Sequence, residues 1–114
     1  MLRIFLAALI LGCATNARAF FYDGNKLVAD LRQFEKAERS DPATEYQASA
    51  SYVGFVLGVH DTISSSLCSS GNLSTRQVTT VVGKHLNEHP ADWGKPAHQL
   101  VAKALRDAFP CRKK

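Results

Sequence analysis

The feature that most constrains the fold of this chain is a pair of cysteines, Cys68 and Cys111, in its second half. The third cysteine, Cys13, lies in an N-terminal segment that we expect to be removed. Two cysteines in a small exported domain usually pair, because the oxidising compartment favours the bond. The loop that they close (111 − 68 = 43 residues) removes about 4 kcal/mol of unfolded-chain entropy in the simple polymer model. We therefore predict a Cys68–Cys111 disulfide that clamps a small domain.

Residues 1–19 have the three parts of a secretory signal peptide. Arg3 supplies the positive start, residues 4–11 form a short apolar run, and residues 17–19 (Ala-Arg-Ala) give the small-residue pattern that signal peptidase requires. The apolar run is far shorter than the roughly 20 residues that span a bilayer, so we expect no stable membrane span. We predict cleavage after Ala19. Lipidation at Cys13 is the less favoured alternative, because one residue before it is unusual in a lipobox.

Removal of residues 1–19 changes what the composition implies. It leaves 95 of the 114 residues for one domain (20–114), which is enough for a modest core. It also lowers the number of basic residues from 14 to 12 against 10 acidic residues, so the net charge falls from +4 to +2. The excess of basic residues lies mostly in the predicted signal peptide and at the chain's end, so we expect no nucleic-acid partner.

The periodicity of apolar residues predicts four helices and no strand, which is an all-α bundle with one disulfide. The first helix follows the turn at residues 23–25 and ends near residue 39, with a narrow apolar stripe at Leu27, Leu31 and Phe34. The second runs from about residue 43 to 67, and Asp41 is its predicted cap. Its expected inward face comprises Tyr46, Ala50, Val53, Leu57, Ile63 and Leu67.

The third and fourth helices carry the clearest boundary signals. Ser74 and Gln77 have the spacing of a capping box, and Pro90 ends the third helix. Valine and leucine line its buried side at positions 78, 81, 82 and 86. The fourth helix has apolar residues at positions 97, 100, 101, 104, 105 and 108, a pattern typical of one buried helical face.

Two glycines stand four residues apart inside the second helix, Gly54 and Gly58. Each weakens a helix by about 1 kcal/mol relative to alanine, so their presence needs a reason. We predict that they allow another helix to pack closely. Dimerisation inside a membrane is a poor explanation, because polar residues flank the pair.

The residue types that support catalysis or metal binding do not form a convincing site. His85 and His89 share one helical face, and His60, Asp61 and His98 are candidate further ligands, but zinc needs three or four converging ligands. A Cys68 nucleophile with a histidine base fails because Cys68 already has a disulfide partner. Asp61 follows His60 directly, so we do not expect the two to interact. We predict no metal, no cofactor and no catalytic residues.

The order of several motifs is similar to one known family. The motifs are residues 21–27 (FYDGNKL), residues 52–61 (YVGFVLGVHD) before Cys68, Gln77 to Pro90, and a closing segment that ends in Ala-Phe-Pro-Cys at residues 108–111. Together they resemble the Rap/Tai immunity proteins, which protect bacteria from peptidoglycan amidases delivered by type VI secretion. Cys68 and Cys111 match that family's late cysteine pair. Leu31 and Tyr52 stand where many members carry a second pair, which implies a less firmly tethered first helix.

The resemblance implies a periplasmic, non-enzymatic inhibitor that occludes a cognate amidase, with a homodimer left open. The alternative is a small helical periplasmic chaperone that exposes apolar surface in acid, and a hydrolase is a third option. Trp93, Tyr22, Phe20 and Phe21 are candidate aromatic anchors. The predicted partner-binding residues lie in two loops and are Ser69, Ser70, Asn72, His89, Asp92, Trp93 and Lys95.

Overall fold

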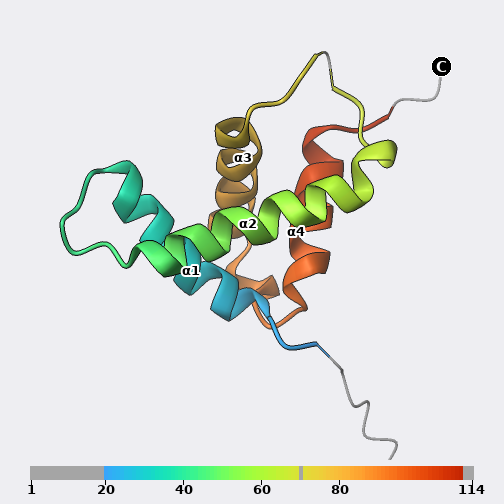
Figure 1. Cartoon of the computed structure of the whole chain (residues 1–114). Coiled ribbons are helices and arrows are strands. Elements are labelled where there is room, and N and C mark those ends of the chain that lie inside the picture. Colours follow the sequence, from blue (N-terminus) through green and yellow to red (C-terminus); the bar gives the residue numbers. More distant parts are fainter. Residues whose placement is uncertain (1–19, 70, 112–114) are drawn as a thin grey trace, which may run out of the picture.

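The computed structural model describes residues 20–69 and 71–111, and within these ranges the chain forms four α-helices and no strand (Figure 1). The predicted signal peptide, with Cys13, and the predicted contact residue Ser70 lie outside the described residues. The helices are α1 (Gly24–Glu38), α2 (Tyr46–Ile63), α3 (Thr75–Glu88) and α4 (Ala97–Ala108). Two short 3-10 turns, η1 (Ser64–Ser66) and η2 (Pro90–Asp92), follow α2 and α3. The predicted all-α architecture is confirmed.

Helix α1 begins at Gly24, inside the stretch predicted as a turn, and the Asp23 side chain caps it by accepting a hydrogen bond from the Lys26 backbone N–H at 2.9 Å. Leu27 and Leu31 are buried, which confirms the apolar stripe. Gly24 lies against the loop before α4, where a Cβ atom would come within 2.5 Å of the Trp93 carbonyl oxygen. The contact explains why only glycine fits at this first position of the helix.

Helix α2 differs from the prediction in both its start and its inward face. It begins at Tyr46, and the Asp41 carboxylate instead accepts from the Ala43 N–H at 2.8 Å, so Asp41 closes a turn and caps no helix. The buried residues of α2 are Ser49, Tyr52 and Val56, whereas Tyr46 is 66% exposed. The predicted inward face was wrong at Tyr46 and Ala50, which are exposed, whereas Val53, Leu57, Ile63 and Leu67 are partly buried against the core. The reason is that α2 is apolar on several sides, so periodicity alone does not identify one of them.

Helices α3 and α4 follow their sequence signals. Ser74 and Gln77 form the predicted capping box, with the Gln77 N–H donating to Ser74 Oγ at 3.1 Å and the Ser74 N–H donating to Gln77 Oε1 at 2.7 Å. Apolar residues of both helices form most of the core, and they pack with Leu27, Leu31, Tyr52 and Val56. The residues from α3 and α4 are Val78, Val82, Leu86, Ala97, Leu100, Val101, Ala104 and Leu105.

In the part of the chain that the structure describes, no helix is both long and apolar enough to cross a membrane.

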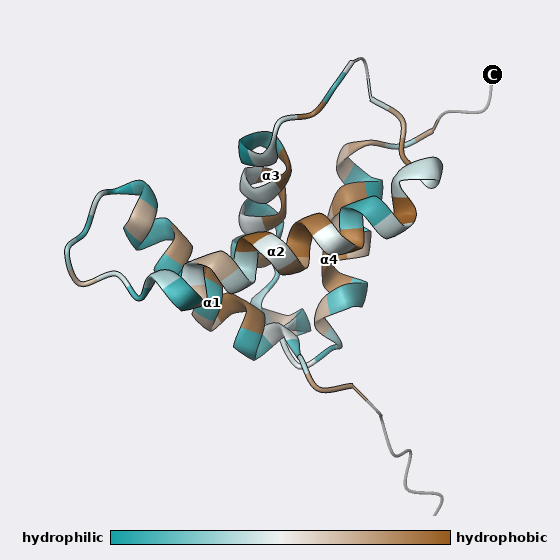
Figure 2. Ribbon diagram, in the orientation of Figure 1, coloured by the Kyte–Doolittle hydropathy of each residue, from teal (hydrophilic) through white to brown (hydrophobic). Residues whose placement is uncertain are grey.

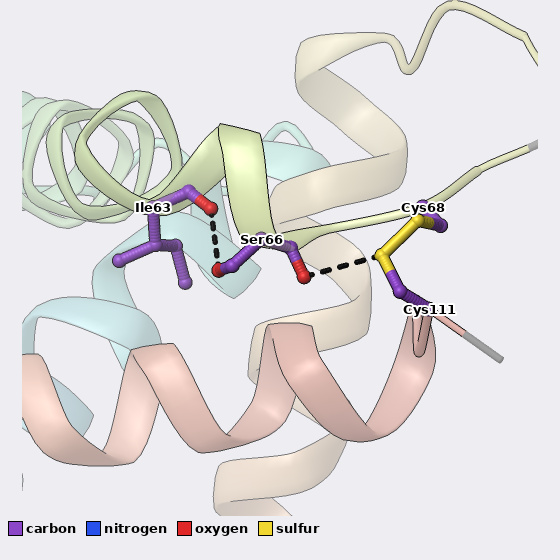
Figure 3. The surroundings of a disulfide bond; sticks show 4 residues. All are labelled: Ile63, Ser66, Cys68 and Cys111. Atoms are coloured by element: carbon purple, nitrogen blue, oxygen red, sulfur yellow. Dashed lines mark hydrogen bonds between the residues drawn. A yellow bond between two sulfur atoms is a disulfide. The ribbon is translucent and has the colours of Figure 1, made fainter. Parts of the chain in front are cut away.

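The predicted disulfide is present and joins the end of the α2–η1 segment to the segment after α4 (Figure 3). The Cα atoms of Cys68 and Cys111 lie 4.9 Å apart. The Cys68 N–H also donates to the Phe109 carbonyl oxygen at 3.0 Å, and Cys111 Sγ lies 3.4 Å from the Ser66 carbonyl oxygen. The bond therefore closes the end of the bundle where α2 and α4 both terminate.

Leu31 and Tyr52 are both buried. They meet above Gly83 of α3, where a Cβ atom would lie 3.1 Å from Leu31 Cδ1 and 3.3 Å from the Tyr52 hydroxyl oxygen. The Tyr52 hydroxyl donates to the Thr79 carbonyl oxygen at 2.6 Å. Packing and a buried hydrogen bond thus attach α1 and α2 to α3 at this point.

Candidate functional site

The structure does not bring the two predicted contact loops together. Residues 69–72 precede α3 and residues 89–95 follow it, so the loops lie at opposite ends of this helix (Figure 1). A helix of 14 residues is about 21 Å long. The two loops therefore form two separate surfaces. That either loop contacts a partner remains a prediction.

The loop before α3 is held by local contacts beside the disulfide. The Ser69 hydroxyl donates to the Gly71 carbonyl oxygen at 2.8 Å, and Gly71 has φ +116°, a conformation that favours glycine. Ser69 and Asn72 are exposed. This loop offers small polar groups to a partner and no large anchoring side chain.

The loop after α3 contains Trp93, which is half-buried and packs against the core. Its Nε1–H donates to the Leu86 carbonyl oxygen at 2.8 Å, and the Arg32 guanidinium lies 5.8 Å from its ring centroid. Lys95 pairs with Asp92 at 3.0 Å and, as a hydrogen-bond donor, lowers the pKa of that carboxyl. Trp93 therefore acts mainly as a cover over the core, because Leu86 holds its indole N–H and Arg32 lies over its ring.

His85 of α3 and His89, the residue that follows the helix, form a stacked pair. The rings of His85 and His89 lie 4.1 Å apart, and His89 Nδ1 contacts the His85 carbonyl oxygen at 2.7 Å. Partial burial, followed by the neighbouring His89, lowers the pKa of His85. Across residues 20–69 and 71–111, no three or more histidine, cysteine, aspartate or glutamate side chains are grouped as a metal site would require.

Cys68, His60 and Asp61 are the remaining candidates for a catalytic site. Cys68 is half of the disulfide, so it carries no free thiol. His60 does contact Asp61, with Nδ1 3.0 Å from a carboxylate oxygen, contrary to our expectation for adjacent residues. The Asp61 side chain is 81% exposed and the His60 side chain 22% exposed, so the contact lies at the surface of the C-terminal part of α2.

A groove of about 630 Å³ lies between α2 and α4. Gly54 and Gly58 lie along it, and a Cβ atom built on either would meet nothing within 4 Å. The prediction that these glycines admit another helix of the same bundle was therefore wrong. The fold places α1, α3 and α4 against other parts of α2 and leaves the glycine face uncovered.

The groove has apolar walls and a basic rim. Phe55, Val59 and Ile63 of α2 and Ala102 of α4 supply the apolar surface. The rim on the α4 side carries His98, Lys103 and Arg106, whereas the residues that line the groove include no acidic side chain. Sequence reasoning missed this site because it depends on how α2 and α4 cross, although the two glycines were its visible signal.

A sequence profile described as Rap1a immunity proteins matches residues 23–111. The match runs from the cap of α1 to the second cysteine of the disulfide, so it includes all four helices. No curated protein matches the chain.

Proposed function

Because the chain belongs to the Rap1a immunity protein family, we propose that it neutralises a toxic effector by binding to it. The effector proposed here is a peptidoglycan amidase delivered by type VI secretion, and the place of action is the periplasm. The observation that carries the proposal is the length of the family match, which extends over the whole helical domain from residue 23 to residue 111.

The proposed mechanism is steric occlusion of the amidase active site. It requires a rigid surface and tight binding, and no chemistry from the inhibitor itself. A nanomolar complex corresponds to about −12 kcal/mol, which is the strength that lasting neutralisation demands. The four-helix core and the disulfide supply rigidity, because they hold α2, α3 and α4 in one arrangement.

Two features support a periplasmic location. The disulfide is a bond that persists in oxidising compartments. Residues 1–19 have the pattern of a cleavable signal peptide, as described above. We propose that cleavage after Ala19 releases a soluble domain and that Cys13 leaves with the signal peptide.

A rescue experiment tests this function. Cells are made to export each type VI amidase effector of the producing bacterium into their own periplasm, and lysis is followed by optical density. Co-expression of the full chain should prevent lysis by one of these amidases, whereas the same chain without residues 1–19 should not. A catalytically inactive amidase serves as the control for export stress. Lysis that continues with every amidase, despite folded protein in the periplasm, would refute the proposal.

A further inference from the structure

Helix α2 carries more apolar surface than the fold covers. Its central segment, residues 52–59 (YVGFVLGV), is apolar on nearly every side, and a helix with this composition is normally buried all round. Only three of its 18 residues are buried: Ser49, Tyr52 and Val56. Figure 2 shows hydrophobic residues along the middle of α2. Such a mismatch between sequence and burial is typical of a helix that a partner covers.

The uncovered side is the groove between α2 and α4. Gly54 and Gly58 have no side chains, and nothing lies within 4 Å of the positions that their Cβ atoms would take. The α2 backbone is therefore accessible at these two residues. Phe55 is held in the groove wall by Tyr22, whose ring centroid lies 4.7 Å from its own. The groove is thus formed by fixed elements of the bundle and exists before any partner arrives.

The charges at the rim indicate what kind of partner fits. Lys103 lines the groove and pairs with Asp107 of the same helix at 3.0 Å, whereas Asp107 does not line the groove. Arg106 has no ion pair within the described residues, and His98 adds a further nitrogen donor or acceptor. An apolar groove with an unbalanced basic rim is complementary to apolar side chains flanked by carboxylates.

We infer that the α2–α4 groove is the docking site for an amphipathic helix of the effector, one whose apolar face is bordered by aspartate or glutamate. The inference rests on the proposed function for the identity of the partner. The apolar face of the incoming helix lies against Phe55, Val59 and Ala102, and its backbone approaches α2 at Gly58. Its carboxylates pair with Lys103 and Arg106. This is the helix-in-groove mode of recognition, in which apolar anchors supply affinity and flanking charges supply orientation.

A peptide titration tests the chemistry of the groove without the effector. The probe is a designed helical peptide with a leucine face bordered by glutamates, and its twin has lysines in place of the glutamates. Each is titrated into the isotope-labelled mature chain while the backbone amide signals are recorded by NMR. The glutamate peptide should shift the signals of Gly54, Gly58 and Ala102, and the lysine twin should bind about tenfold more weakly. Equal binding of the twins, no shift at the groove, or shifts confined to other surfaces would overturn the inference.

Matched variants separate loss of docking from loss of folding. Gly58→Leu fills the groove with a good helix former, and Ala29→Leu makes a similar change on the exposed side of α1. Lys103→Glu reverses a charge on the rim, and Lys84→Glu reverses one in an equivalent i,i+4 pair of α3. The two groove variants should lose peptide binding without a fall in melting temperature, which Gly58→Leu should raise because it removes a helical glycine. The two control variants should keep peptide binding.

The same four variants decide the question for the effector itself. With the amidase that the rescue experiment identifies, Gly58→Leu and Lys103→Glu should weaken binding in calorimetry at least tenfold, and the controls should not. An amidase that both groove variants still inhibit fully would refute the groove and leave the proposed function intact. Failure of the wild type to neutralise any amidase would instead refute the function. A concentration-dependent dimer that Gly58→Leu abolishes would show that a second copy covers the groove, and it would overturn the inference.

Discussion

The double substitution Gly54→Ala/Gly58→Ala should stabilise the protein. Both glycines lie inside α2, where glycine costs about 0.8–1.0 kcal/mol relative to alanine because it leaves the unfolded backbone more freedom to lose. The added Cβ atoms meet nothing within 4 Å, so no steric cost offsets this gain. The cost of glycine belongs to the backbone of each residue separately, so the two gains should add. We expect a gain of about 1–2 kcal/mol in the free energy of unfolding.

The measurement is thermal unfolding followed by circular dichroism at 222 nm. For a domain of this size, 1 kcal/mol corresponds to roughly 4–8 °C, so the melting temperature should rise by about 4–16 °C. Gly24→Ala is the matched control, because its Cβ atom would come within 2.5 Å of the Trp93 carbonyl oxygen and of the Leu100 side chain. The same chemical change should there destabilise the protein by about 1–3 kcal/mol.

A lower melting temperature for the double variant would refute this reasoning. It would mean that something packs closely against Gly54 and Gly58 in the isolated protein, as the sequence pattern alone suggested. A rise would instead show that these glycines are kept at a cost to stability, which is common where a surface is kept for binding.

Three further perturbations test other parts of the structure. Replacing Cys68 and Cys111 together by serine should cost about 4 kcal/mol, since the bond closes a 43-residue separation, and reductant should lower the melting temperature of the wild type but not of the variant. Tyr52→Phe should cost about 1 kcal/mol in urea unfolding, because it removes the buried hydrogen bond to the Thr79 carbonyl oxygen; an unchanged midpoint would contradict that role. The pKa of His85 is lowered in the folded state, so the unfolded state binds the proton more readily. The stability that neutral His85 contributes is complete above about pH 6.5 and is lost as the pH falls from there toward the lower folded-state pKa; His85→Gln should reduce this dependence in melting curves at a series of pH values.

Much of the fold was predictable because its signals are local. The capping box of Ser74 and Gln77 and the 3.6-residue periodicity of α3 and α4 both depend on residues within a few positions of one another. The disulfide was predictable for a different reason. Once the predicted signal peptide, residues 1–19, is set aside, only Cys68 and Cys111 remain to pair.

The tertiary structure decided which side of α2 is covered and where a partner can bind. A helix that is apolar all round has several equivalent faces, and only its packing against α1, α3 and α4 selects the one with Ser49, Tyr52 and Val56. The same packing leaves Gly54 and Gly58 open and separates the two predicted contact loops by the length of α3. Backbone hydrogen bonding and capping act over one turn of chain, whereas the choice of a buried face depends on total burial by elements far apart in sequence. The cysteine pair and the helices therefore follow from the sequence by itself, and the groove between α2 and α4 follows only from how those helices cross.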